Sequence, residues 1–387
     1  MGAIFTPREM IDRLIAFDTT SRSSNLALID FVAEYLKGHG LNPKLIPNAE
    51  RTKSNLLVTL GPEAPGGIIL SGHTDVVPVD DQAWDNDPFR VVEKDGKLFG
   101  RGTADMKSFS AIALALVPEF LRRRVKTPVH IALSYDEEIG CLGVRPMLAD
   151  IARNLPRPKL AIIGEPTDMK VVNAHKGIRS FRTTVTGREA HSSQTDKGVN
   201  AVMVAAELIV HLRDLADDMR RRGDTSGRFD PPYTTVQSSV IEGGTALNIL
   251  AHHCTFQWEF RFLPGANETE ILERFDAYAR DHILPRLKQI APEADIVTTA
   301  RSRVPPLVPD DNSPAEALAK QLTGRNSAEA VSYGTEAGLF QEAEIPAVVC
   351  GPGNIAQAHK PNEFIELSQV DACVAFMRRL IDHVCAD

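Results

Sequence analysis

The sequence predicts an α/β fold with a mixed, mostly parallel sheet, helices on both faces of that sheet, and an inserted α+β domain. Helical and strand patterns alternate over residues 1–177, which is typical of a sheet covered by helices. From residue 178 the pattern changes, and the earlier alternation resumes beyond a proline-rich linker at 304–309. We therefore expect one discontinuous domain formed by residues 1–177 and 299–387, with residues 178–298 as the insertion.

The first domain is expected to alternate helices with buried strands. Helical patterns cover residues 11–15, 26–36 and 109–124, and residues 55–59 have a strand pattern. Short apolar runs also predict buried strands, at residues 67–72, 130–135, 160–164 and 346–350. This alternation implies a mostly parallel sheet.

The insertion is expected to form a two-layer, ferredoxin-like unit. Residues 178–186 alternate in strand fashion, and residues 200–222 have a helical pattern with an apolar stripe. The segments that follow predict two strands, a helix and a strand, at 234–241, 254–263, 268–287 and 296–300. The resulting order, βαββαβ, is that of the ferredoxin-like motif.

The composition argues against several classes of partner. The chain has 387 residues and a formal net charge of −8, whereas a nucleic-acid or anionic-membrane partner would favour a basic surface. No apolar run approaches the roughly 20 residues of a membrane span, and the N-terminus lacks the pattern of a secretory signal. The 5 cysteines form no Cys-x-x-Cys motif, which suits a reducing compartment. We therefore expect a cytoplasmic protein without nucleic-acid or membrane partners.

Polar side chains follow four of the predicted strands at the point where each strand ends. They are His73, Glu138, Glu165 and His359. In open α/β sheets the carboxyl ends of the strands form the edge where ligands bind. A fifth residue, Asp105, lies in the glycine-rich turn 100–107. Each residue alone would more often be an ordinary polar residue, so the prediction of a site rests on the five together.

The types of these side chains indicate two metal ions. Imidazole and carboxylate ligands without cysteine suit Zn, Mn or Co in a catalytic site. Two histidines and three carboxylates are too many for one open tetrahedral ion, and they fit two ions about 3.5–4 Å apart that share a carboxylate. Asp105 is the natural bridge. Asp75, two residues after His73, is expected to accept a hydrogen bond from the ring nitrogen that the metal leaves free.

The adjacent residues Glu137 and Glu138 are expected to have different roles, because neighbouring side chains in an extended loop point apart. One carboxylate can bind metal. The other can take a proton from a water molecule that the ions activate. A solvated acidic loop is the alternative for both residues.

Four motifs resemble the M20 family of dinuclear metallohydrolases, and the similarity extends over nearly the whole chain. They lie at residues 71–75, 100–107, 136–138 and 164–167. The resemblance implies a zinc-peptidase type of fold that holds two divalent ions, expected to be zinc, with cobalt or manganese as alternatives.

The resemblance also implies roles for the site residues. The expected ligands are His73 and Glu165 for one ion, Glu138 and His359 for the other, and Asp105 between them. Glu137 is the general base that the family pattern implies. The insertion is implied to be a lid and dimerisation domain, so we expect a homodimer.

Further residues match positions that act on the substrate in this family. His191 is similar to the histidine that reaches across the dimer to the oxyanion, and Asn248 and Arg261 are similar to groups that hold the substrate carboxylate. The side chains suit those roles, because arginine can form a bidentate pair of hydrogen bonds with a carboxylate and histidine can donate a hydrogen bond to a developing oxyanion. Arg179 and Thr335 are additional candidates for the same pocket. Without the resemblance, His191 and Arg261 would be interpreted as surface side chains.

The C-terminal stretch is most similar to the family members that deacetylate acetylornithine. Segments 332–340, 351–353 and 357–363 carry this similarity. It implies removal of the acetyl group from N2-acetyl-L-ornithine, in arginine biosynthesis. Glu336 is then expected either to face the side-chain ammonium of the substrate or to serve the structure. The alternatives are another M20 activity, such as a desuccinylase, a broad acylase or a carboxypeptidase, and an inactive binding protein on the same fold.

Overall fold

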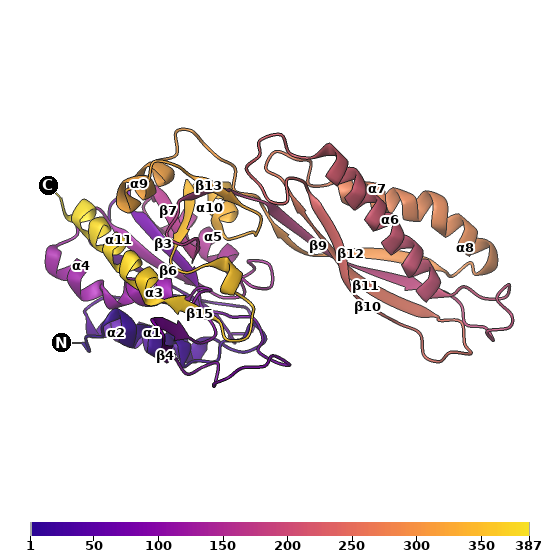
Figure 1. Ribbon diagram of the computed structural model, residues 1–387, viewed down its shortest axis with the longest axis horizontal. Helices are drawn as coiled ribbons and strands as arrows, with labels where there is room; N and C mark the ends of the chain where they lie inside the picture. The colour runs from indigo at the N-terminus through magenta and orange to yellow at the C-terminus, as the bar shows by residue number, and fades with distance from the viewer. Residues whose placement is uncertain (1, 387) are drawn as a thin grey trace. The chain divides into compact units, whose positions relative to one another are not determined.

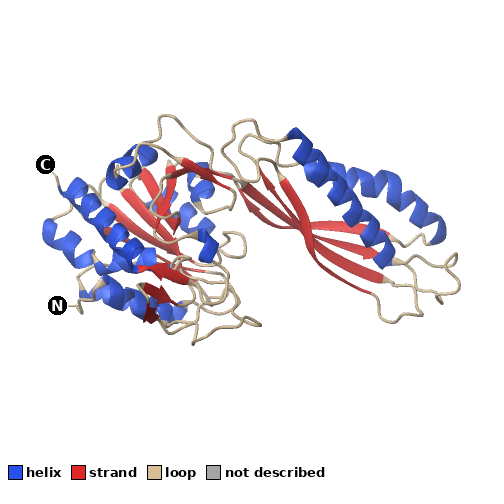
Figure 2. Cartoon of the chain, in the orientation of Figure 1, coloured by secondary structure: helices blue, strands red, loops and turns tan. Residues whose placement is uncertain are grey.

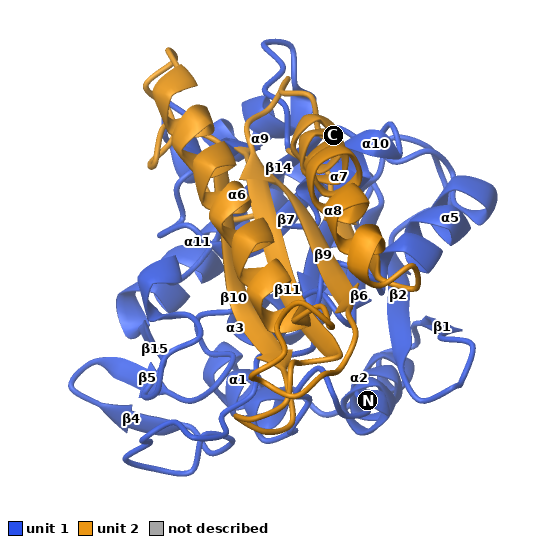
Figure 3. Ribbon diagram, turned by 90° about the vertical axis from the view of Figure 1, so that its right-hand side faces the viewer, with its two compact units in different colours: residues 1–174, 307–330, 335–387 blue, residues 175–306, 331–334 orange. Residues whose placement is uncertain are grey.

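The computed structural model describes residues 2–386, and it divides into two compact units (Figure 1; Figure 3). Unit 1 comprises the described residues up to Ala174, together with Leu307–Ala330 and the residues from Thr335 onwards. Unit 2 comprises His175–Pro306 and Val331–Gly334. The chain thus leaves unit 1 and later returns to it.

Unit 1 is built on a mixed sheet (Figure 2), which over the described residues has the strand order β1-β2-β6-β3-β7-β14-β8-β13. The strands are β1 (Lys44–Pro47), β2 (Ser54–Leu60), β3 (Ile68–His73), β6 (Val129–Ser134), β7 (Leu160–Pro166), β8 (Val172–His175), β13 (Glu329–Val331) and β14 (Ala347–Gly351). The four central strands are parallel: β3 pairs with β6 and β7, and β14 pairs with β7. The predicted parallel centre of the sheet is therefore confirmed.

The central strands are covered on both faces. Every residue of β3, β6 and β7 is buried, which requires helices above and below the sheet. The helices of unit 1 are α1 (Pro7–Ile15), α2 (Leu26–Gly38), α3 (Lys107–Ala115), α4 (Val117–Arg123), α5 (Val144–Asn154), α9 (Pro314–Thr323), α10 (Ala337–Glu342) and α11 (Leu367–Cys385). A small sheet, ordered β15-β5-β4, completes the unit with β4 (Val92–Lys94), β5 (Lys97–Phe99) and β15 (Phe364–Glu366).

One predicted helix is divided in the structure. The pattern over 109–124 predicts one long helix, whereas α3 ends at Ala115 and α4 begins at Val117. Pro118 lies in the first turn of α4, where a missing backbone N–H is tolerated but where the preceding helix cannot continue. Leu116 is therefore both the C-cap of α3 and the N-cap of α4.

Unit 2 is a four-stranded antiparallel sheet with helices packed on it. Its elements are β9 (Gly177–Thr186), α6 (Ala201–Arg222), β10 (Thr235–Gly243), β11 (His253–Phe262), α7 (Glu270–Tyr278), a π-helical turn (Ala279–Ile283), α8 (Leu284–Ile290) and β12 (Asp295–Val304). The strand order is β10-β11-β9-β12. The expected boundary at residue 298 falls inside β12, because pairing with β9 continues to Val304.

The core of unit 2 lies on one face of this sheet. In β11, buried residues alternate with less buried ones, and Phe256, Trp258 and Phe260 are all buried. Phe275 of α7 packs against Phe256 and Trp258, with ring centroids 6.3 and 4.8 Å away. The opposite face of the sheet carries the intervening side chains, among them Arg261.

Across residues 2–386, the structure contains no helix that combines the length and the apolar character needed to cross a membrane.

Candidate metal centre

The carboxyl ends of neighbouring strands bring the predicted ligands together at one edge of the sheet of unit 1. His73 is the last residue of β3, and Glu165 is the penultimate residue of β7. Glu137 and Glu138 follow β6, which ends at Ser134. Because β3 is parallel to both β6 and β7, these side chains leave the sheet on the same edge.

The remaining two ligands come from turns. Asp105 precedes α3, which begins at Lys107. His359 follows a short 3-10 turn, Ile355–Gln357, which comes after β14 in the chain. His359 has a φ of 64°, a left-handed conformation that surrounding contacts must hold in place for a residue with a side chain.

The contacts divide the cluster around two histidines. His73 Nε2 lies 3.1 Å from Asp105 Oδ1 and 3.7 Å from Glu165 Oε1. His359 Nε2 lies 3.3 Å from Asp105 Oδ2 and 3.0 Å from Glu138 Oε2. The two oxygens of Asp105 thus face different histidines, which is the arrangement required of a bridging carboxylate.

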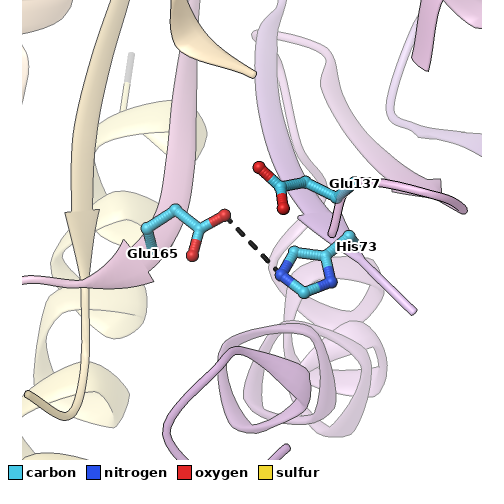
Figure 4. A group of neighbouring side chains, drawn as sticks. All are labelled: His73, Glu137 and Glu165. Carbon is cyan, nitrogen blue, oxygen red and sulfur yellow. Dashed lines mark ion pairs between the residues drawn. The ribbon is translucent and has the colours of Figure 1, made fainter. Parts of the chain in front are cut away.

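The cluster is compact enough for its donor atoms to form overlapping groups. Donor atoms of His73, Asp105 and Glu138 lie within 4.8 Å of one another, and so do those of His73, Glu137 and Glu165. Figure 4 shows the carboxylates of Glu137 and Glu165 facing the ring of His73. Both groups contain His73. The direct contact between His359 and Glu138 nevertheless assigns Glu138 to the side of the cluster that holds His359.

Burial controls the charges of these groups. Burial raises the pKa of Glu138 to about 7, and the nearby Asp105 carboxylate adds to the shift. Burial also raises the pKa of Glu165, again with Asp105 as the next cause. Hydrogen bonds to Asp105 and Glu138 raise the pKa of His359 to about 10. Each of these shifts arises where acidic and basic groups face one another across the cluster at short distances.

The donor set fits two divalent cations. Three carboxylates and two imidazoles converge, and hard-to-intermediate ligands of this kind suit zinc, manganese or cobalt. Carboxylates this close repel one another when they are removed from water, and cations relieve that repulsion. His359 is 54% exposed, whereas His73 is 1% exposed, so the cluster is open on the side of His359.

Asp75 contacts the ring of His73 and also the loop after β6. The ring nitrogen His73 Nδ1 is 2.9 Å from the backbone carbonyl oxygen of Asp75 and 3.5 Å from its carboxylate. The carboxylate accepts hydrogen bonds from the backbone N–H groups of Glu137 and Glu138, at 3.1 and 3.3 Å. The hydroxyl of Ser21 also donates to it, at 2.7 Å. Asp75 therefore fixes the loop after β6 as well as the ring of His73.

The substrate-side candidates of unit 2 form two separate groups. His191 and Asn248 are exposed, and their segments lie side by side, since Ser192 N–H donates to Asn248 O at 3.0 Å. Arg261 is the register partner of Ile178, at the start of β9. Between Ile178 and Thr186, β9 extends over eight residue steps, or about 26 Å. Since His191 lies beyond the far end of β9, Arg261 and His191 of one chain are at opposite ends of the sheet.

Arg179 does not share a sheet face with Arg261. Arg179 is the register partner of Phe260, which is buried on the helix-covered face, and register partners point to the same face. Its guanidinium lies over the ring of Phe181, 5.4 Å from the centroid. The structure therefore does not bring these two arginines together in one pocket.

Thr335 and Glu336 are buried inside unit 1. The Thr335 hydroxyl accepts a hydrogen bond from Ala337 N–H at 3.0 Å, at the start of α10. The Glu336 carboxylate accepts hydrogen bonds from Ser134 at 2.6 Å and from Ser71 at 3.3 Å. Burial raises the pKa of Glu336 to about 7. These contacts favour the structural alternative for Glu336 over contact with a substrate ammonium.

An imidazole–carboxylate cluster at the carboxyl edge of an α/β sheet is typical of metal-dependent hydrolases. A family profile described as Peptidase family M20/M25/M40 matches residues 69–383, and the chain belongs to this family. Members of a peptidase family hydrolyse amide bonds, so the chain is an amide hydrolase.

Two curated relatives are named acetylornithine deacetylase. The one from Photorhabdus laumondii is 37% identical over 96% of this chain and 93% of its own length. The one from Pasteurella multocida is 34% identical and covers 97% of both chains.

Solved structures share the fold at low identity. An M20 family metallo-carboxypeptidase from Sulfolobus solfataricus has a TM-score of 0.78 at 16% identity and covers 99% of this chain and 100% of its own. A dinuclear metal-binding peptidase of the M20 family from Bacillus subtilis has a TM-score of 0.65 at 16% identity and covers 98% of both chains.

Metal removal is expected to destabilise the protein, because the buried carboxylates lose the cations that offset their repulsion. At a free metal concentration 100 times the dissociation constant, each ion stabilises the folded state by about 2.7 kcal/mol. Thermal unfolding with a chelator, and again after addition of Zn²⁺, measures this effect. Asp105→Asn should abolish most of the difference. Equal unfolding temperatures for metal-free and Zn²⁺-loaded wild type would contradict the assignment.

Proposed function

We propose that this chain removes the acetyl group from N2-acetyl-L-ornithine and releases L-ornithine and acetate, as a step of arginine biosynthesis. The acetylornithine deacetylases that align over nearly the whole chain support the choice of substrate. The structural observation that carries the proposal is the position of Glu137. Its carboxylate lies within the ligand cluster, while the two histidines pair with Asp105, Glu138 and Glu165.

Glu137 is proposed as the general base. Burial raises the pKa of Glu137 to about 8, against the opposing charge of His73. Cations bound beside it would act in the direction of His73 and lower this pKa again. A carboxylate with a pKa close to the working pH takes a proton from the attacking water and later returns it to the leaving α-amine.

Two bound divalent ions, proposed to be zinc with cobalt or manganese as alternatives, would supply Lewis-acid activation of the water and of the acetyl carbonyl. The residues proposed to hold them are His73 and Glu165 on one side, His359 and Glu138 on the other, and Asp105 between them. Asp75 keeps the loop of Glu137 and Glu138 in place through its two amide contacts.

The residues of unit 2 are proposed to act on the substrate across a homodimer. His191 is proposed to donate to the developing oxyanion, and Asn248 and Arg261 to hold the substrate carboxylate. Within one chain about 26 Å of strand separates Arg261 from the end of the sheet that carries His191. A substrate as small as acetylornithine cannot contact both, so we propose that the partner subunit supplies one of them.

The edge strand β10 is the proposed dimer contact. It is one of the two terminal strands of the sheet in unit 2, and it exposes apolar side chains on both faces, with Val240 at 40% and Ile241 at 50% exposure. An exposed, apolar strand edge favours pairing with another chain.

A cytoplasmic location is also proposed, because the described cysteines are all free thiols, which suits a reducing compartment.

A kinetic panel tests the substrate. We expect the value of kcat/KM for N2-acetyl-L-ornithine to exceed those for succinyl-diaminopimelate, acetylmethionine and a dipeptide by at least about tenfold, which corresponds to roughly 1.4 kcal/mol of transition-state binding. A preference for one of the other three substrates would replace the proposal with the corresponding M20 activity. No metal-dependent hydrolysis of any of them would indicate an inactive binding protein.

Glu137→Gln is expected to lower kcat by about 10²- to 10⁴-fold, because the amide cannot accept the proton of the attacking water. The variant keeps the size of the side chain and should still bind two ions, which metal analysis of the purified protein measures. Turnover within a few-fold of wild type would show that Glu137 is not the base.

Mixing two inactive variants tests the contribution of the partner. In a heterodimer of Glu137→Gln and His191→Ala, one site combines Glu137 of one chain with His191 of the other, so random mixing should restore about a quarter of wild-type activity. Absence of recovery would place both residues in the same chain. Ile241→Lys in both variants should prevent recovery, whereas Val297→Lys on β12, an equally exposed position at 47%, should permit it.

A further inference from the structure

A buried ion pair lies directly beside the proposed metal ligands. Arg101 Nη1 and Glu363 Oε2 are 2.7 Å apart, and both residues are 1% exposed. Both belong to unit 1. Removing an ion pair from water costs free energy, and a buried pair is frequently no more stabilising than well-packed apolar residues. The pair therefore needs an explanation other than stability.

The second oxygen of Glu363 organises the turn that carries Asp105. Glu363 Oε1 accepts hydrogen bonds from the backbone N–H groups of Gly102, Ala104 and Asp105, at 3.1, 2.8 and 3.1 Å. The backbone carbonyl of Glu363 also accepts from Gly100 N–H at 2.9 Å. A carboxylate is suited to this position, because an anion accepts several amide hydrogen bonds at once. The turn before α3 is thus wrapped around one oxygen atom.

The same ion pair also reaches the loop of His359. Arg101 donates to the carbonyl oxygen of Lys360 at 3.3 Å and to Gln82 Oε1 at 2.6 Å. Gln82 Nε2 in turn donates to the carbonyl oxygen of His359 at 3.0 Å. These contacts hold the backbone of His359, whose φ of 64° is costly without such support.

We propose that Glu363 is a positioning residue that fixes Asp105 relative to His359. It would thereby set the spacing between these two proposed ligands of the same metal ion. The proposal rests on the metal centre of the proposed function. Glu363 acts through the backbone of Asp105 on one side and through Arg101 and Gln82 on the other. It is not itself a ligand, since both of its oxygens are occupied by these donors.

The test is a titration of the metal-free protein with Zn²⁺ against a chromophoric chelator, for wild type and Glu363→Gln. The glutamine keeps the size of the side chain but turns an N–H toward Arg101 or toward the amides. We expect wild type to bind two ions, and the variant to hold the more weakly bound ion at least about tenfold less tightly, in line with the loss of groups that orient ligands. Dissociation constants within twofold of wild type would overturn the proposal, even if the unfolding temperature falls.

Two further variants separate positioning from folding. Gln82→Ala removes the link between Arg101 and the His359 carbonyl, together with a hydrogen bond from the Trp84 ring nitrogen, on a partly exposed loop. It should weaken the same ion several-fold without loss of the fold. If Glu363→Gln does not fold, an unchanged affinity in Gln82→Ala overturns the proposal. Glu344→Gln, which breaks an exposed pair with Arg157, should leave both ions unaffected.

The Co²⁺-loaded proteins provide a second readout. Glu363→Gln should change the visible absorption of the bound Co²⁺, because the ligand spacing changes, whereas Glu344→Gln should not. At saturating metal, kcat of Glu363→Gln should fall while KM stays within about twofold, since Glu363 contacts no substrate. If the wild type binds fewer than two ions, the metal centre itself is refuted. If the wild type binds two ions and Glu363→Gln has the same affinities and the same Co²⁺ absorption, only the positioning role is refuted.

Discussion

The gathering of buried negative charge at one edge of a parallel sheet is the constraint on which unit 1 depends. Asp105, Glu138 and Glu165 lie close together where water is largely excluded, and carboxylates in such a place remain ionised only beside positive charge. The two imidazoles face these carboxylates within the chain, and divalent cations held between them would supply the positive charge. The fold around the cluster keeps these mutually repelling groups from moving apart.

Backbone amides supply much of that restraint. Asp75 and Glu363 are both buried carboxylates, and each accepts hydrogen bonds from the peptide N–H groups that carry site residues. Neither has to leave its position during a reaction. Glu137 lies beside them with a different partner, since its carboxylate accepts a hydrogen bond from the thiol of Cys141 at 3.2 Å. The task proposed for it is proton transfer, whereas Asp75 and Glu363 hold backbone in place.

The sequence was sufficient to predict that these side chains gather, because parallel strands end at a common edge. His73 and Glu165 could thus be placed from the apolar runs before them. Contacts set by long-range register could not be predicted. Nothing near Arg101 in the sequence identifies Glu363 as its partner, and the face occupied by Arg179 depends on its pairing with Phe260. Glu336 was ambiguous because its burial under Ser71 and Ser134 is a property of packing rather than of local pattern.

The register of β9 with β12 places the two junctions between unit 1 and unit 2 close together. Ile178 and Val304 are direct partners, so the chain enters and leaves unit 2 through neighbouring strand ends. Insertions are tolerated where the two junctions lie close together, because the host then needs no rearrangement to accommodate them. Unit 2 is therefore a module that recombination could exchange for another while the sheet of unit 1, with the edge that carries the histidines and carboxylates, is inherited unchanged.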